Sequence, residues 1–87
     1  MKYRLKIESR ARKDLEALDT VAQRRIIKKL KFFLAQDDPL QYAKKLTDPA
    51  GGDYRWRIGP YRAVFDIEGE TIKLLHVQHR REVYRSK

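Results

Sequence analysis

The chain has 87 residues, of which 38% are charged and 41% hydrophobic, and it contains no cysteine. We expect a single domain over residues 1–87, without disulfides, zinc–thiolate sites or a catalytic thiol. The net charge of +9 favours a polyanionic partner: nucleic acid, an acidic membrane surface or an acidic protein. No apolar run approaches the ~20 residues of a membrane span. The absence of cysteine makes a cytoplasmic protein the simplest interpretation, and we expect no membrane partner.

The N-terminal half predicts one strand followed by two helices. Apolar and charged residues alternate over residues 2–8, which is the period of a half-buried strand. A first helix follows over residues 9–18, and Thr20 with Gln23 resembles the capping box of a second. Apolar residues recur at helical spacing in that second helix, which should end before Pro39. We expect the two helices to form a hairpin.

The C-terminal half predicts a loop followed by three strands. Residues 38–53 contain two prolines and two glycines and are expected to be mostly loop. Alternating apolar residues then indicate three strands joined by glycine-containing turns. The predicted strands are residues 54–58, 61–67 and 71–79. The last is apolar on both sides, so we expect it in the interior of the sheet.

The predicted order is β-α-α-β-β-β. It describes an α+β fold in which the helical hairpin packs on one face of a small, mainly antiparallel sheet. Successive side chains of a strand point to opposite faces. Arg55, Arg57 and Arg62 are therefore expected to project together from the uncovered face, and Trp56 to lie in the core.

With these elements and residues, the chain resembles the RelE/ParE superfamily of bacterial and archaeal toxins. The resemblance covers nearly the whole chain and is carried by Tyr54-Arg-x-Arg, by Gly59-x-Tyr61-Arg62, by a hydrophobic strand, and by His79-Arg80 with Val83-Tyr84. It implies a toxin paired with an antitoxin, which we expect to be acidic. The RelE-like branch is implied to cut mRNA in the ribosomal A site, in contact with ribosomal RNA. The ParE-like branch is implied to act on DNA gyrase without cutting nucleic acid.

The resemblance also implies roles for individual residues, and it favours the RelE-like branch. Arg62 would stabilise the phosphate in the transition state, Arg80 would assist the leaving oxygen, and Tyr84 would orient the substrate nucleotide. The proposed attack by the ribose 2′-hydroxyl needs no cofactor and no metal. The acidic residues of the chain form no convincing metal cluster.

Arg55 and Arg57 stand where such nucleases often carry lysine. Arginine holds phosphate well, but its pKa of ~12.5 or higher makes it a poor general base. His79 is the natural substitute, because the unperturbed pKa of histidine is ~6.5. His76 lies three residues earlier, is expected on the opposite strand face, and is interpreted as structural.

Further cations are expected to contact RNA. These are Lys44, Lys45 and Arg81. Two alternatives stay open beside the ribonuclease. One is a ParE-like toxin that binds gyrase and cuts nothing, and the other is a plain RNA-binding or ribosome-associated module.

Overall fold

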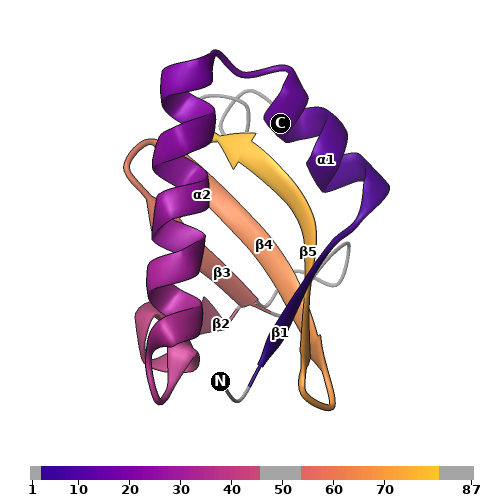
Figure 1. Cartoon of the computed structure of the whole chain (residues 1–87), viewed down its shortest axis with the longest axis vertical. Coiled ribbons are helices and arrows are strands. Elements are labelled where there is room, and N and C mark those ends of the chain that lie inside the picture. The colour runs from indigo at the N-terminus through magenta and orange to yellow at the C-terminus, as the bar shows by residue number, and fades with distance from the viewer. Residues whose placement is uncertain (1–2, 46–53, 81–87) are drawn as a thin grey trace.

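The structure is a computed structural model that describes residues 3–45 and 54–80. Helix α2 runs across one face of a five-stranded sheet, and the shorter helix α1 lies beside strand β5 (Figure 1). In chain order the elements are β1 (Arg4–Ile7), α1 (Ser9–Glu16), α2 (Thr20–Ala35), the 3-10 helix η1 (Pro39–Tyr42), β2 (Ala43–Lys45), β3 (Tyr54–Ile58), β4 (Tyr61–Glu68) and β5 (Thr71–His79). Within the described ranges, no helix is long and apolar enough to cross a membrane.

The sheet has the order β1-β5-β4-β3-β2. Strand β1 is parallel to β5, and the other neighbouring pairs are antiparallel. Two helices on a mixed, mainly antiparallel sheet confirm the predicted α+β fold and its element order. Strand β5 lies between β1 and β4, in the interior as predicted, and its Ile72 and Leu74 are fully buried.

One irregularity in β5 decides which of its side chains share a face. Phe65 pairs with Leu74, whereas the preceding Val64 pairs with His76, so Leu75 is an extra residue on β5. A bulge of this kind inserts one residue into one strand of an antiparallel pair. Because side chains alternate with a period of two, every residue after the bulge faces the opposite way from a regular strand.

Helix α1 protects the edge of β5 beyond the end of β1. Strand β1 ends at Ile7, and the next residue, Glu8, donates its backbone N–H to the oxygen of Leu74 at 2.9 Å. Further along β5, the backbone N–H of Val77 donates to the Asp14 carboxylate of α1, also at 2.9 Å. A side-chain oxygen thus replaces a neighbouring strand as the partner of an edge amide.

The N-cap of helix α2 lies one residue earlier than predicted. The carboxylate of Asp19 accepts the backbone N–H of Ala22 at 2.8 Å, so Asp19 rather than Thr20 is the N-cap. The side chain of Gln23 donates to the backbone oxygen of Leu18 and does not close a capping box. The predicted capping box was wrong because the preceding aspartate, an equally good capping residue, starts the helix first.

The segment predicted as a loop contains η1 and strand β2. The carboxylate of Asp38 accepts the backbone N–H of Leu40 at 3.1 Å and starts the short helix at Pro39. The indole N–H of Trp56 donates to the backbone oxygen of Pro39 at 3.1 Å and fastens η1 to the sheet. Strand β2 then pairs antiparallel with β3. Its three residues give no sequence signal, because the strand depends on pairing with β3 and not on its own propensity.

An aromatic stack holds α2 against the sheet. Trp56 and Phe65 are fully buried with ring centroids 4.0 Å apart, and Phe33 of α2 stacks on Trp56 at 4.8 Å. Ile26 and Leu30 continue the buried stripe of α2. Burying each such side chain contributes roughly 1.5–3 kcal/mol. Trp56 is therefore a core residue, as predicted, and the core lies on the helix side of the sheet.

Candidate functional site

Four cations gather on the sheet face that points away from the core. Lys44 of β2 lies opposite Arg55 of β3, and Arg57 of β3 lies opposite Arg62 of β4. These positions alternate with the buried Trp56, so their side chains leave the sheet on the other side. The prediction that the three arginines share one face is confirmed. Lys44, Arg55, Arg57 and Arg62 are together termed the cationic face.

The arrangement sets like charges directly opposite each other in two cross-strand pairs. Residues directly opposite in antiparallel strands have Cβ atoms about 4.5–5.5 Å apart, and like charges there are destabilising. A cross-strand pair contributes roughly 0.2–1 kcal/mol, so each like-charged pair should weaken the sheet by a similar amount. Among the residues that the structure describes, neither of these two cross-strand rows holds a carboxylate. An anion above the cationic face would relieve the repulsion.

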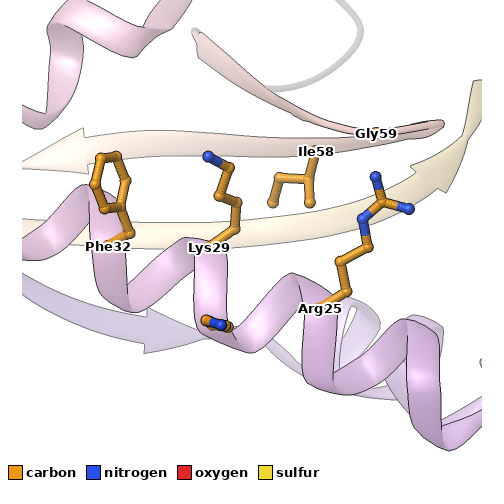
Figure 2. Close-up of a pocket in the computed structure, with 6 residues that line it drawn as sticks. Arg25, Lys29, Phe32, Ile58 and Gly59 are labelled. Atoms are coloured by element: carbon orange, nitrogen blue, oxygen red, sulfur yellow. The ribbon is translucent and has the colours of Figure 1, made fainter.

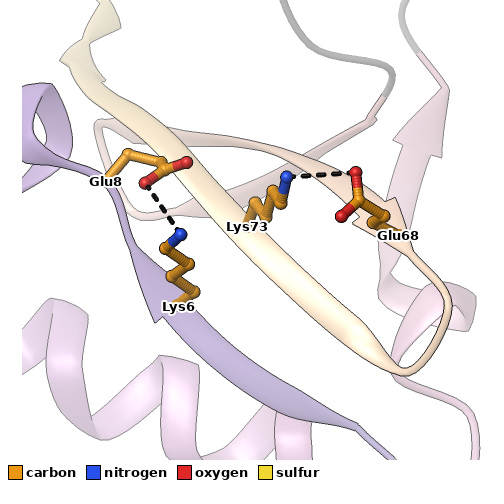
Figure 3. A network of polar contacts seen from close by, with 4 residues as sticks. All are labelled: Lys6, Glu8, Glu68 and Lys73. Carbon is orange, nitrogen blue, oxygen red and sulfur yellow. Dashed lines mark hydrogen bonds and ion pairs between the residues drawn. The ribbon is translucent and has the colours of Figure 1, made fainter.

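Charge is balanced at the other end of the same face. Lys6 of β1 pairs with Lys73 of β5, which again sets two like charges in register. Here each lysine has a carboxylate: Lys73 Nζ is 3.1 Å from Glu68, and Lys6 Nζ is 4.0 Å from Glu8 (Figure 3). The sequence thus supplies acidic side chains beside the like-charged pair at this end of the sheet.

The exit of β5 brings another cation to the same end of the sheet as Arg57 and Arg62. The backbone N–H of Arg80 donates to the oxygen of Pro60 at 2.8 Å, one step beyond the pair of Tyr61 and His79. Arg80 is exposed and lies beside the turn that joins β3 to β4. Three separate strands therefore bring arginines to one end of the sheet.

The two histidines lie on opposite faces of β5, as their spacing predicted. His79 pairs with Tyr61 on the helix-covered face, with ring centroids 5.3 Å apart and ring planes at 89°. His79 therefore does not share the face of Arg62. His76 does, because it pairs with Val64, two residues along β4 from Arg62. The histidine set aside as structural is the one beside the cationic face.

The surroundings of His76 favour its neutral form. Its Nδ1 is buried and has no hydrogen-bond partner among the described residues. Burial lowers the pKa of His76 below its ordinary value of 6.5; Arg10 lowers it further, Asp14 raises it, and Arg62 lowers it. The lowered pKa favours the uncharged imidazole, which is the form that can accept a proton.

The remaining predicted residues divide between the two faces or lie outside the described ranges. Lys45 pairs with Tyr54, which shares a face with Trp56, so Lys45 leaves the sheet on the side opposite to Lys44. The two neighbouring lysines therefore cannot both contribute to the cationic face. Arg81 and Tyr84 lie outside the described residues.

The sequence matches the family described as the ParE toxin of the type II toxin–antitoxin system parDE, over residues 5–84. The chain belongs to the RelE/ParE toxin superfamily. It is also similar to toxin RelG of Mycobacterium tuberculosis, with 32% identity over 90 residues that cover 98% of this chain and 99% of the relative.

Solved structures of RelE-type proteins share the toxin's fold. The RelBE2 toxin–antitoxin complex of Mycobacterium tuberculosis matches with a TM-score of 0.79 and 27% identity, over 92% of this chain and 100% of that one. The archaeal RelE–RelB complex of Pyrococcus horikoshii matches with a TM-score of 0.71 and 28% identity, over 92% and 97%. The toxin is thus a type II toxin with RelE-like structural neighbours.

Proposed function

We propose that this toxin is a ribosome-dependent endoribonuclease that cuts mRNA in the ribosomal A site without a metal ion and so inhibits translation. The cationic face supports the proposal most strongly, because it sets two like-charged pairs in register where an RNA phosphate would compensate them. RNA also carries the 2′-hydroxyl that the reaction requires and that DNA lacks. The RelE-like neighbours place the toxin among proteins of the same fold.

The arginines would stabilise the charge that develops during cleavage. The 2′-hydroxyl loses its proton and attacks the adjacent phosphorus in line, while the bond from phosphorus to the 5′-oxygen breaks. The leaving oxygen takes up a proton from water, which gives a 2′,3′-cyclic phosphate and a free 5′-hydroxyl. Arg62, with Arg57 opposite and Arg55 beside them, would hold the phosphate oxygens as negative charge grows. Arg80, beside the β3–β4 turn, would assist the leaving oxygen.

A histidine would accept the proton of the 2′-hydroxyl. His76 shares the face of Arg62, and its lowered pKa favours the uncharged form that can accept a proton. We therefore assign the role first to His76, and second to His79 at the end of the strand. Acid–base assistance of this kind contributes roughly 10²–10⁴-fold. Separate glutamine substitutions of the two histidines would distinguish them.

Other predicted residues keep their proposed roles. Tyr84 would orient the substrate nucleotide, and further RNA contacts are proposed for Lys44 and Arg81. A separate RNA contact, away from the cleavage site, is proposed for Lys45, which leaves the sheet on the side opposite to Lys44. Among the described residues, no group of three or more histidine, aspartate or glutamate side chains could hold a metal ion. Because the proposed attack by the 2′-hydroxyl uses only side chains of the toxin, we expect cleavage to persist when chelators are present.

The proposed partner is an acidic antitoxin in the cytoplasm. The RelBE2 and archaeal RelE–RelB structures are complexes of a toxin with an antitoxin. The net charge of +9 would draw an acidic protein to this toxin by long-range attraction. Ribosomal RNA and mRNA are the proposed targets of the toxin once the antitoxin is absent.

A ParE-like inhibitor of DNA gyrase is the second candidate, because the family match over residues 5–84 is to ParE toxins. Brief expression in cells, followed by sequencing of RNA 5′ ends and by gel analysis of plasmid supercoiling, separates the two. New 5′ ends within codons would support the ribonuclease. Intact transcripts with altered supercoiling would support gyrase inhibition and refute the ribonuclease.

A further inference from the structure

A second positively charged surface lies on the helix side of the molecule. A cavity of about 270 Å³ opens between α2 and the turn that follows β3. It is lined by Arg25, Lys28, Lys29, Phe32, Ile58 and Gly59, which we name the α2 groove. In Figure 2, Arg25 reaches from the helix toward Gly59, and Ile58 points from the strand toward the helix. The sheet separates this groove from the cationic face.

The charge of α2 is one-sided. Five lysines and arginines and no acidic residue occur between Thr20 and Ala35. Arg25 and Lys29 are spaced i, i+4, and like charges at this spacing weaken a helix by roughly 0.2–0.5 kcal/mol. The fold of the isolated chain does not require these like charges, and an anionic partner would offset their cost.

The groove also offers an apolar surface. Phe32 is 43% exposed, and Tyr42, whose ring centroid lies 5.6 Å from that of Phe32, is 42% exposed. The ammonium group of Lys29 sits over the Phe32 ring, 4.9 Å from its centroid. That contact occupies a face on which a nucleic-acid base would otherwise stack. The combination of apolar surface and cations favours a carboxylate-rich peptide with aliphatic side chains over single-stranded RNA.

Gly59 shapes one end of the groove. Its φ of +58° is readily adopted by glycine. A Cβ atom at this position would also lie 2.5 Å from a terminal nitrogen of Arg25, so any side chain would displace the guanidinium. Asparagine tolerates positive φ better than other non-glycine residues. Gly59→Asn therefore tests the guanidinium position with little change to the turn.

We propose that the α2 groove is the docking site for an acidic, aliphatic-containing segment of the antitoxin. The inference rests on the proposed antitoxin partnership and adds where and how part of that partner binds. In this arrangement the arginine and lysines of the groove pair with carboxylates, and an aliphatic side chain covers Phe32. Antitoxin recognition and RNA cleavage then use surfaces on opposite sides of the sheet.

The test uses a synthetic octapeptide, acetyl-Glu-Asp-Leu-Glu-Glu-Leu-Asp-Glu-amide, and the full-length toxin. Binding is followed by NMR through the Gly59 amide resonance. Arg25→Glu or Lys29→Glu should weaken binding at least about tenfold, because each places a like charge against the peptide. Lys31→Glu is the matched control: it makes the same charge change on the same helix but outside the groove, and it should weaken binding less than about threefold.

Two further arms test the apolar contact and the choice of ligand. A peptide with serine in place of both leucines should bind at least about fivefold more weakly, because Phe32 is left uncovered. Gly59→Asn should weaken binding of the original peptide, which is followed for this variant through the amide resonance of Ile58, another lining residue of the groove. An equal effect of Lys31→Glu, or binding of an oligouridylate at Gly59 in preference to the peptide, would overturn the proposal.

The docking site and the ribonuclease can fail independently. The Arg25→Glu toxin should no longer bind the peptide but should still cut mRNA on ribosomes. The Arg62→Ala toxin should no longer cut mRNA but should still bind the peptide. If Arg25→Glu abolishes cutting and leaves peptide binding intact, the α2 groove is an RNA contact and the docking proposal is refuted. If wild-type toxin binds the peptide but does not cut mRNA, the docking proposal is supported and the ribonuclease proposal is refuted.

Discussion

Reversing the charge of Arg57 should stabilise the toxin and abolish its activity. Arg57 is exposed on β3 and lies directly opposite Arg62 of β4. Arg57→Glu converts a like-charged cross-strand pair into an oppositely charged one. Each such pair is worth roughly 0.2–1 kcal/mol, so the free energy of unfolding should rise by about 0.4–2 kcal/mol. In a domain of this size 1 kcal/mol shifts the melting temperature by roughly 4–8 °C, so a gain of several degrees is expected.

Thermal unfolding followed by circular dichroism, at about 20 mM and about 500 mM salt, measures this effect. The gain should shrink at high salt, because screening weakens both the repulsion that is lost and the attraction that replaces it. Arg57→Gln should give an intermediate gain, since it removes only the repulsion. Lys73→Glu is the same reversal at the balanced end and should destabilise, because the new carboxylate would face both Asp66 and Glu68, which outweigh its attraction to Lys6. The reasoning would be refuted if the Arg57→Glu toxin were no more stable than wild type, or if its gain in melting temperature were the same at both salt concentrations.

Three other predictions concern single side chains. Arg62→Ala should abolish mRNA cutting on ribosomes and leave the circular dichroism spectrum unchanged; undiminished cutting would remove Arg62 from the site. Asp14→Ala should lower the free energy of unfolding by about 1–3 kcal/mol, measured by urea titration, because the edge N–H of Val77 loses its acceptor; no loss would show that this bond is dispensable. The pKa of His76 is lowered on folding, so its contribution to stability is complete above pH 6.5 and declines as pH falls through the folded pKa. His76→Gln should make that decline shallower in unfolding titrations between pH 7 and 5, and an unchanged pH dependence would contradict the assignment.

The fold follows from local patterns that the sequence carries in full. Alternation over residues 2–8 and within the C-terminal strands, together with helical periodicity before Pro39, is enough to predict the order β-α-α-β-β-β. Glycine marks both tight turns, where Gly59 and Gly69 have positive φ. Strand β2 escaped prediction because three residues acquire strand geometry only by pairing with β3.

The site was predictable in part, because faces follow from alternation but register does not. Alternation alone places Arg55, Arg57 and Arg62 on one face. That Arg57 stands directly opposite Arg62, and that a bulge at Leu75 turns His76 toward them, depends on how β3, β4 and β5 pair. The bulge has no sequence signal of its own, so the histidine beside the cationic face could not be chosen in advance.

The α2 groove could be recognised only from the three-dimensional structure. Its cations are visible in the sequence, but their periodicity is that of an ordinary solvated helix face. Only the fold brings Gly59 beside Arg25 and places Lys29 over the ring of Phe32. Contacts between distant segments, rather than residue types, distinguish this surface from the rest of the helix.

Cleavage of a defined mRNA by the purified toxin on programmed ribosomes tests the cationic face most directly. Primer extension should show a break within the A-site codon for wild-type toxin, with and without chelator, and no break for Arg62→Ala. A wild-type toxin that leaves the mRNA whole, or an Arg62→Ala toxin that cuts it as well as wild type, would contradict this account.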